Sequence, residues 1–537
     1  MPFIFTKFDA SSTSQTMMIT KFKLKRSLIY AVFTLLSLGF VTSCADRSKA
    51  HKPPNIIVFL VDDMGLMDTT VPFITDAGGN PVEYPLNSFY RTPNMEKLAA
   101  QGIRFTNFYA HSVCSPTRAS ILTGQNSARH GVTNWINSER NNRTAFGPTN
   151  WNWNGLTKNT LTLPRSLQQE GYRTIHVGKA HLGPFNSEGE DPLNLGFDVN
   201  IGGSSIGQPG SYYGEEGFGH INGNTSRAVN DLENYHGKDI FLTEALTLEA
   251  NKAIAQAHAE GKPFFLNMAH YAVHAPFQSD PRFVDNYKDS GKSEKAQAYA
   301  TLIEGIDKSL GDIIQQVQQL GLGDNTLLLF LGDNGSDAPL PIEDDYSSAS
   351  PLKGKKGNHW EGGMRVPFIA SWITPNTNVA VQQQMPIASH AVQTQLGSVI
   401  DLFATLTTVA NVNPPEGYIT DGFKLQEQFK GHENPSRDTR FLNHFPHGDH
   451  RTNYFTSLVS EDWKIIYHYQ VDAQPQYELY NLKEDPFETH NLADTQPEQL
   501  DLMMQTLAEE MKSKQALYPA KEGQPLPLLM PVLNSHQ

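Results

Sequence analysis

"NIIVFLV", residues 55–61, is an uncharged run that ends directly in Asp62 and Asp63. Three comparable stretches follow along the chain: "RTIHVG" (173–178), "PFFLNMAHYAVH" (263–274) and "TLLLFLG" (326–332). Continuous apolar runs of this kind are typical of strands buried on both faces of a sheet. We therefore predict four strands of one largely parallel sheet, with 55–61 as the first.

Helical patterns lie between these strands and each closes on a glycine. They are "NMEKLAAQG" (94–102), "TLPRSLQQEG" (162–171) and "AYATLIEGIDKSLGDIIQQVQQLG" (298–321). Alternation of strands and helices predicts an α/β fold with a large, mixed, mostly parallel sheet sandwiched by helices. In such sheets ligands bind beyond the carboxyl ends of the strands, where the polar residues at the ends of all four predicted strands would lie.

The last hundred residues have a different pattern. "WKIIYHYQ" (463–470) and "QYELYNL" (476–482) predict a short antiparallel pair, followed by a helix over 498–515. We predict a catalytic domain over 45–430 and a small C-terminal α+β subdomain over 431–537. The glycine-rich segment 201–220 is predicted to be a long loop over the site.

Residues 1–44 predict an export signal. The basic segment "KFKLKR" (21–26) precedes an apolar run that ends in "VTSC" (41–44). These four residues resemble the bacterial lipobox, in which the cysteine takes lipid. We expect an exported protein, periplasmic or at the cell surface, attached to the outer membrane through a lipid on Cys44. A plain secretory signal with a chance cysteine is the alternative.

Composition limits the partners. The 537 residues carry 56 acidic and 42 basic side chains, which argues against nucleic acid as the main partner. An anionic substrate would therefore need a local cluster of positive charge. Only two cysteines occur, Cys44 and Cys114. Lipid on Cys44 would leave the mature chain without an internal disulfide.

Oxygen-bearing side chains follow two of the predicted strands. Asp62 and Asp63 come after the first strand, and Asp333 and Asn334 follow the strand 326–332. Adjacent carboxylates repel unless a cation or donors compensate them, and carboxylate and amide oxygens suit a hard ion such as Ca²⁺ or Mg²⁺. A turn in which one aspartate caps the next helix is the structural alternative.

The segment around Cys114 predicts the start of a helix. Ser115 can cap it, Pro116 fits its first position and Gly124 can close it. Arg118 would then lie one turn beyond Cys114. A helix start lowers the pKa of a thiol and stabilises anions. The alternative is a buried structural cysteine.

Cys114 to Arg118, "CSPTR", resembles the C-x-P-x-R signature of the type I sulfatases, which belong to the alkaline-phosphatase-like superfamily. Six further stretches resemble the family in the same order, over roughly residues 53–495. They are "NIIVFLVDDMG", "GYRTIHVGKAHLG", "HAPF", "DNTLLLFLGDNG", "GKKGNHWEGGMRVP" and "YELYNLKEDPFETHNL".

The resemblance implies that a formylglycine-generating enzyme or an anaerobic maturase oxidises Cys114 to formylglycine. The hydrated aldehyde would attack sulfur with one oxygen and later expel sulfate by collapsing back. One Ca²⁺ ion would polarise the sulfate and the attacking oxygen. The implied metal ligands are Asp62, Asp63, Cys114 as formylglycine, Asp333 and Asn334.

The resemblance also assigns catalytic roles, to Cys114, Arg118, Lys179, His181, His274 and Lys356. Arg118 would hold the diol oxyanion, and Lys179 and His181, two apart in an extended segment, would contact the formylglycine and sulfate oxygens. His181 is the implied base for collapse, and His274 would protonate the leaving alcohol. Lys356 would bind sulfate, with neighbouring Lys355 as the alternative. His270 is left unassigned.

The expected activity is removal of sulfate from a sulfated sugar or polysaccharide. A phosphodiesterase or phosphonate monoester hydrolase of the same superfamily is the alternative enzyme, although Asn334 stands where we would expect a histidine there. A catalytically silent, lipid-anchored glycan-binding protein is the alternative from another class. Four residues could line a sugar subsite or equally be packing residues: Trp151, Trp153, His444 and His447.

Overall fold

The stretch Asn55–Val61 forms β1, the strand around which the large sheet is built. In the computed structural model, which describes residues 53–220, 225–341, 348–469 and 475–532, β1 pairs in parallel with β6 (Phe264–His270) and β7 (Thr326–Gly332). β4 (Arg173–Gly178) pairs in parallel with β6. The four predicted strands are therefore adjacent, in the order β4-β6-β1-β7.

Four shorter strands complete this sheet of eight, in the order β5-β4-β6-β1-β7-β8-β2-β9. They are β5 (Val199–Ile201), β8 (Phe368–Trp372), β2 (Ile103–Phe105) and β9 (Ala391–Gln393). β8 is antiparallel to β7 and β2, whereas every other neighbouring pair is parallel. The predicted mixed, mostly parallel sheet is confirmed.

Side chains of β1 alternate between two hydrophobic cores, one on each face of the sheet. Ile57, Phe59 and Val61 belong to one core, and Ile56, Val58 and Leu60 to the other. Full burial of one such side chain contributes about 1.5–3 kcal/mol. This explains why the sequence of β1 is apolar at every position and not only at alternate ones.

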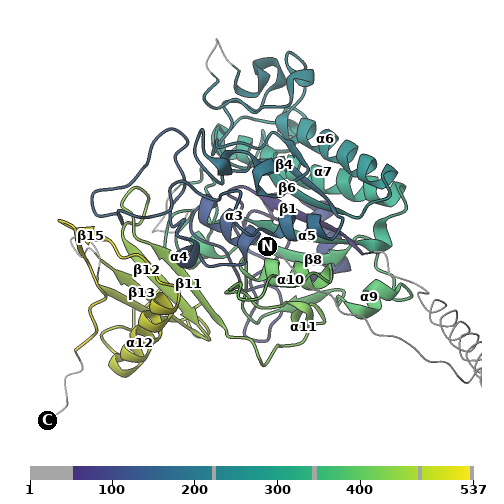
Figure 1. Cartoon of the computed structure of the whole chain (residues 1–537). Coiled ribbons are helices and arrows are strands. Elements are labelled where there is room, and N and C mark those ends of the chain that lie inside the picture. Colours follow the sequence, from purple (N-terminus) through teal and green to yellow (C-terminus); the bar gives the residue numbers. More distant parts are fainter. Residues whose placement is uncertain (1–52, 221–224, 342–347, 470–474, 533–537) are drawn as a thin grey trace, which may run out of the picture. The chain divides into compact units, whose positions relative to one another are not determined.

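Helices cover both faces of the sheet (Figure 1). Helices α2 (Pro93–Gln101), α6 (Leu242–Ala259) and α7 (Glu294–Gln319) contribute to the core that contains Phe59. Helices α3 (Cys114–Thr123), α5 (Leu163–Gln169) and α10 (Asp401–Val409) contribute to the core that contains Val58. The predicted sandwich of helices around the sheet is confirmed.

The C-terminal part contains a four-stranded antiparallel sheet rather than a pair of strands. Its order is β11 (Arg440–Phe445), β12 (Phe455–Ser460), β13 (Trp463–His468) and β14 (Tyr477–Asn481). The prediction found β13 and β14 but missed β11 and β12. The missed strands bury polar side chains, including Asn443, His444 and Ser457, so neither has a plain apolar pattern.

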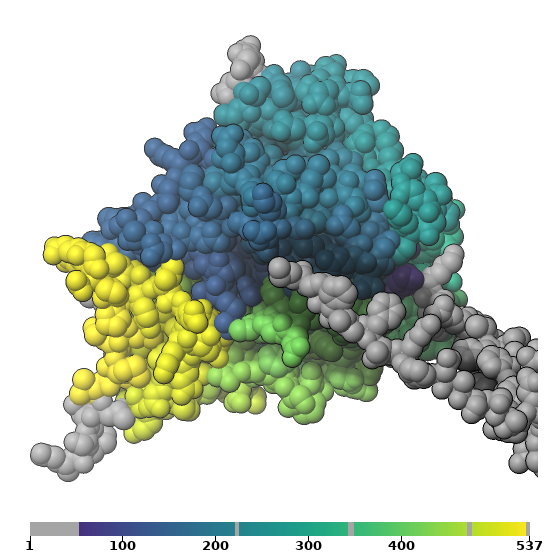
Figure 2. Space-filling view, in the orientation of Figure 1, coloured from purple at the N-terminus to yellow at the C-terminus, as the bar shows by residue number. Residues whose placement is uncertain are grey.

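The two faces of this second sheet have different neighbours. Helix α12 (Pro497–Ser513) packs on one face through leucine and methionine side chains. On the other face Phe445, Phe455 and Ile466 pack with Val113, the residue before Cys114. Figure 2 shows the yellow C-terminal part directly against a blue segment from the first third of the chain. The C-terminal sheet therefore supports the start of α3.

The remaining elements are short. They are β3 (Phe108–Tyr109), β10 (Gly397–Ser398), β15 (Ala520–Lys521), β16 (Gln524–Pro525), α4 (Ser127–His130), α8 (Glu361–Met364), α9 (Ala380–Gln384), α11 (Gln426–Phe429) and several single 3-10 turns. The described residues from Pro53 onward form one compact unit, and the boundary at residue 430 stays a prediction. The predicted export signal and Cys44 lie outside the described residues. Among the residues described, we find no helix with the length and apolarity to cross a membrane.

Candidate active site

Two strand ends bring three carboxylates together at one edge of the large sheet. Val61 of β1 pairs with Gly332 of β7, so the residues that follow each strand become neighbours. The backbone N–H of Asp63 donates to Asp333 Oδ1 at 3.0 Å. Carboxylate oxygens of Asp62, Asp63 and Asp333 lie within 4.8 Å of one another, and all three residues are buried. With Asn334 we call them the carboxylate cluster.

Three cations from separate segments neutralise this cluster. Lys179, directly after β4, lies 2.7 Å from Asp62, and Arg118 of α3 lies 2.8 Å from Asp333. Lys356, in the loop before α8, lies 2.7 Å from Asp63. Each cation is buried, and a buried charge is tolerated when it is paired and hydrogen-bonded.

The carboxylates do not share this compensation equally. Burial, together with the charge of Asp62, raises the pKa of Asp333 to about 6. Burial also raises the pKa of Asp62, against the opposing effect of Lys179. At Asp63 burial is outweighed by Lys356 and His274, which hold the pKa of that carboxyl well below its usual range. The cluster thus retains repulsion that a further cation would relieve.

Asn334 adds an unpartnered oxygen atom to the carboxylate cluster. Its amide nitrogen donates to Asp63 Oδ1 at 2.9 Å and to the carbonyl of Gly335 at 3.0 Å. Its amide oxygen is buried and accepts no hydrogen bond from any described residue. An unpartnered amide oxygen beside three carboxylates is the donor set that a hard divalent cation prefers. These residues therefore fit a metal ion.

Cys114 lies at the first position of α3, and not before its cap as we predicted. The cap is Val113, without a side-chain hydrogen bond, and Ser115 lies inside the helix, where its hydroxyl accepts from the backbone N–H of Ile136 at 3.1 Å. Gly124 ends the helix with a φ of 67°, as expected. The predicted lowering of the thiol pKa is wrong, because burial raises the pKa of Cys114 despite the nearby Lys179 and Lys356.

His181 faces Cys114, with 3.4 Å between its Nδ1 and the sulfur. Its Nε2 lies 2.6 Å from the carbonyl oxygen of Ile136, which can only accept, so Nε2 carries the proton. Nδ1 therefore presents a lone pair to position 114. Burial, followed by the charge of Lys179, lowers the pKa of His181 well below its ordinary value and keeps the ring neutral.

The extended spacing invoked for Lys179 and His181 is only partly correct. His181 has a φ of 55°, so the backbone leaves the extended conformation between the two residues. Both side chains still reach the cluster region, one through Asp62 and the other through Cys114. A local turn, rather than strand alternation, directs them to the same place.

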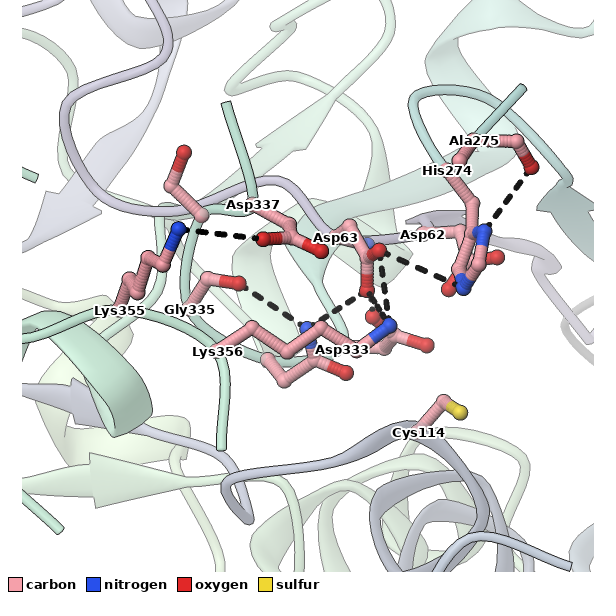
Figure 3. A network of polar contacts seen from close by, with 12 residues as sticks. Asp62, Asp63, Cys114, His274, Ala275, Asp333, Gly335, Asp337, Lys355 and Lys356 are labelled. Atoms are coloured by element: carbon pink, nitrogen blue, oxygen red, sulfur yellow. Dashed lines mark hydrogen bonds and ion pairs between the residues drawn. The ribbon is translucent and has the colours of Figure 1, made fainter. Parts of the chain in front are cut away.

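His274 and Lys356 complete the group around Asp63. His274 Nε2 lies 3.6 Å from Asp63 Oδ2, and its Nδ1 donates to the carbonyl of Ala275 at 3.0 Å. Burial and the charge of Lys356 lower the pKa of His274 to about 4. Figure 3 shows Lys356 reaching Asp63 while Lys355 turns to Asp337, 3.8 Å away. Lys356, and not Lys355, therefore belongs to the site.

A cavity of about 310 Å³ opens onto this group of residues. Cys114, His181, His274 and Lys356 form its base. Its walls include residues that our sequence analysis did not name as site residues: Trp135, Asn137, Glu139, Gln208, Arg227 and His450. Gln208 belongs to the loop 201–220 predicted to lie over the site. Scattered single residues on loops carry no local pattern, so only the fold could identify the other walls.

The four residues considered for a sugar subsite do not line this cavity. His444 is buried between Thr456 Oγ1 and the carbonyl of Leu517, and His447 contacts Thr133 Oγ1. Trp151 packs against the His447 ring, and Trp153 donates to the carbonyl of Asn137. These side chains are packing residues.

His270, left unassigned, is also a packing residue. It is fully buried, and its Nε2 lies 2.9 Å from Ser309 Oγ.

Comparison with known proteins identifies the family to which the chain belongs. The family model named Sulfatase matches residues 54–412, which include every residue of the carboxylate cluster and the cavity base. The chain belongs to the sulfatase family. A second model, the C-terminal region of N-sulphoglucosamine sulphohydrolase, matches residues 359–516 of this sulfatase-family chain.

Individual relatives agree with this placement. N-acetylgalactosamine-6-sulfatase of Mus musculus is 32% identical over 388 residues, covering 70% of this chain and 66% of that relative, just under two thirds of its length. A sulfatase of Formosa agariphila is 25% identical over 560 residues, covering 94% and 95%. The solved structure of Ps i-CgsB in complex with k-i-k-neocarrahexaose has a TM-score of 0.66 at 23% identity, covering 86% of this chain and 93% of that one. This sulfatase-family member therefore shares its fold with solved relatives.

Proposed function

We propose that this protein is an exported, calcium-dependent sulfatase that releases sulfate from a sulfated carbohydrate. The reaction is hydrolysis of a sulfate monoester, in which water and ROSO₃⁻ give ROH and hydrogen sulfate. The observation that carries the proposal is the neutral Nδ1 of His181, 3.4 Å from residue 114 and beside the carboxylate cluster. Family membership and the sugar named for the 32% identical relative support the substrate class.

The residues present suit the two groups that the family uses. Asp62, Asp63, Asp333 and Asn334 would hold Ca²⁺, because they offer carboxylate oxygens and an unpartnered amide oxygen. When bound, the ion supplies fixed positive charge for sulfate oxygens, and oxidation of Cys114 to formylglycine supplies a hydrated aldehyde as nucleophile. The sulfur of Cys114 occupies the position at which the oxidised Cβ would carry its oxygen.

The chain's own cations bind and orient the sulfate. Lys179 and Lys356 are held by Asp62 and Asp63, and Arg118 is held by Asp333. Their positions are set before substrate arrives, so little reorganisation is needed as negative charge develops. Arg118 also donates to the carbonyl of Lys179 at 2.7 Å, which couples two of these cations.

The two histidines divide the proton transfers. His181 accepts a proton at Nδ1 from the group at position 114, because its Nε2 proton is committed to Ile136. His274 must be protonated at Nε2 to donate to the leaving alcohol, since its Nδ1 proton is committed to Ala275. Burial lowers the pKa of His274 to about 4 without substrate. A sulfate monoanion beside the ring raises that pKa and favours the acid form.

Hydrolysis of sulfate esters compared with hydrolysis of phosphorus esters is the decisive test. The purified protein is assayed on sulfated saccharides and on phosphodiester and phosphonate analogues of the same alcohols. We expect sulfate as the product and Asp333→Asn to lower its release at least about thousandfold, because the ligand set and the Arg118 anchor are lost. Asp285→Asn serves as the matched control, because Asp285 is exposed and pairs with the exposed Lys288. Release of the alcohol from the phosphodiester or the phosphonate monoester, without sulfate release from the sulfated saccharides, would favour the phosphodiesterase alternative.

Maturation, metal dependence and export are measured separately. In active protein, the peptide containing residue 114 should have the mass expected with formylglycine at that position. An unmodified thiol there would refute the proposed nucleophile. Chelation should abolish activity, and Ca²⁺ should restore it. The lipid proposal rests on residues 41–44 alone, and a mature N-terminus elsewhere than a lipid-bearing Cys44 would refute it.

A further inference from the structure

Arg227 lines the cavity and has a charge that no described residue pairs. It is exposed, and it forms no ion pair with any described residue. Lys356, the other lysine or arginine that lines the cavity, is already held by Asp63. The carbonyl of Arg227 accepts from the backbone N–H of Gly210 at 2.7 Å, which ties its backbone to the loop that bears Gln208. Arg227 therefore has a fixed backbone and, among the described residues, no ion-pair partner, so that it can bind an anion other than the sulfate at the base.

Trp135 provides an aromatic wall in the same cavity. It is half-buried and packs against the apolar cluster of Val113, Phe445 and Phe455. Its backbone N–H donates to Asn134 Oδ1 at 2.9 Å, and its carbonyl accepts from Asn142 at 3.0 Å. A tryptophan fixed in this way presents large contact area at a low entropic cost, as in sites that bind partly apolar, partly polar ligands. The apolar face of a sugar ring is such a ligand.

The depth of the cavity restricts how a saccharide can enter. Cys114 is only 3% exposed at the base. The volume of about 310 Å³ is at the lower end for ligand pockets, which suits a short saccharide better than a continuous polymer. A sulfated ring must therefore enter the cavity to reach position 114. A ring in the middle of a chain has two neighbours to accommodate, whereas a terminal ring has one.

We propose that this site acts on the terminal ring of short sulfated saccharides that carry a second anionic group, which Arg227 binds while the ring packs on Trp135. The second group is a carboxylate or another sulfate. Glu139, which also lines the cavity and has no ion pair to a described residue, would accept hydrogen bonds from sugar hydroxyls. This inference rests on the proposed sulfatase function and adds the substrate's charge and the position of the cleaved group.

Selectivity for the second anion tests Arg227. The holoenzyme is assayed on three disaccharides with the same sulfated terminal ring, whose neighbouring ring bears a carboxylate, a sulfate or, after reduction of the carboxylate, a neutral alcohol. We expect kcat/KM for the better of the two anionic substrates to exceed that for the neutral alcohol at least about tenfold, as for a charge-assisted hydrogen bond. Arg227→Ala should bring this ratio to within about twofold, and Arg227→Lys should retain part of it. Arg91→Ala, exposed and outside the cavity, is the control.

A ratio that Arg227→Ala leaves unchanged would overturn the role of Arg227 while the sulfatase proposal stands. Absence of sulfate release from every saccharide would refute both proposals. The terminal mode is tested on trisaccharides with a single sulfate on the terminal or the central ring. We expect release from the terminal ring at least about a hundredfold faster, and comparable rates on both would overturn the terminal mode.

Discussion

Two buried groups of side chains in this protein each bring potential metal ligands together, and they differ in whether the active-site cavity adjoins them. One is the carboxylate cluster at the edge of the large sheet, and the other consists of His359, His468 and Glu478 at the second sheet. Each places three potential metal ligands within 4.8 Å. Composition and proximity alone would assign a metal to both.

The carboxylate of Glu478 already accepts four hydrogen bonds. His359 and His468 lie 3.1 and 2.8 Å from Oε1, and Trp360 and Tyr480 donate to Oε2 at 3.0 and 2.5 Å. Four donors match the lone pairs of one carboxylate. The carboxylate cluster leaves Asn334 Oδ1 unpartnered and adjoins the base of a cavity, whereas His359 and His468 also leave their Nδ1 atoms unpartnered among the described residues but do not line this cavity. Unmet acceptor capacity beside a cavity, rather than clustering itself, marks the site that binds a ligand.

Lysine substitutions test the catalytic side of this comparison with the largest expected effect. Lys356→Ala should lower kcat/KM for a sulfate ester by about a hundred- to a thousandfold, because a preorganised cation is removed. Lys355→Ala, at the adjacent residue, should cost less than about threefold, since among the described residues the ion pair of its side chain is with Asp337, at 3.8 Å. Sulfate-release kinetics on one ester measure both. A larger loss in the Lys355 variant would reverse our assignment.

Glu478→Gln tests the structural side. We expect the free energy of unfolding to fall by about 2–4 kcal/mol, because two histidines and two further donors lose a charged acceptor. Sulfate release per folded molecule should fall far less than in the Lys356 variant. Denaturant unfolding gives the stability, and the exposed Glu427→Gln is the control. An unchanged stability with lost activity would show that Glu478 belongs to the catalytic machinery.

The dependence of folding stability on acid pH tests the group around Glu478 through a smaller effect. Burial lowers the pKa of His359 to about 4 from its ordinary 6.5. As the pH falls, His359 therefore takes up a proton in the unfolded chain before it does so in the folded protein. The stability that the neutral His359 contributes is present above pH 6.5 and is lost as the pH falls towards 4. One such proton gives a slope of up to about 1.4 kcal/mol per pH unit. His359→Gln should show a slope shallower by that amount in unfolding experiments between pH 6.5 and 4.5. Equal slopes would contradict the assigned burial effect.

Prediction from sequence succeeded where the signal is local. The ranges 55–61 and 326–332 match β1 and β7 residue for residue, because burial on both faces makes every position apolar. It failed for β11 and β12, whose buried polar residues find partners across the sheet, and for the Ser115 cap. It also raised His444 and Trp151 as sugar-binding candidates, although their partners lie elsewhere in the chain.

By itself, the sequence determined the central strands, the sandwich of helices and, through ordered motifs, the family. These depend on periodicity and on short contiguous patterns. The tertiary structure alone decided that Lys356 rather than Lys355 reaches Asp63, that His181 keeps its free lone pair towards residue 114, and that Arg227 and Trp135 share a cavity. Each of these facts depends on contacts between residues far apart in the chain, and only packing of the whole fold sets such contacts.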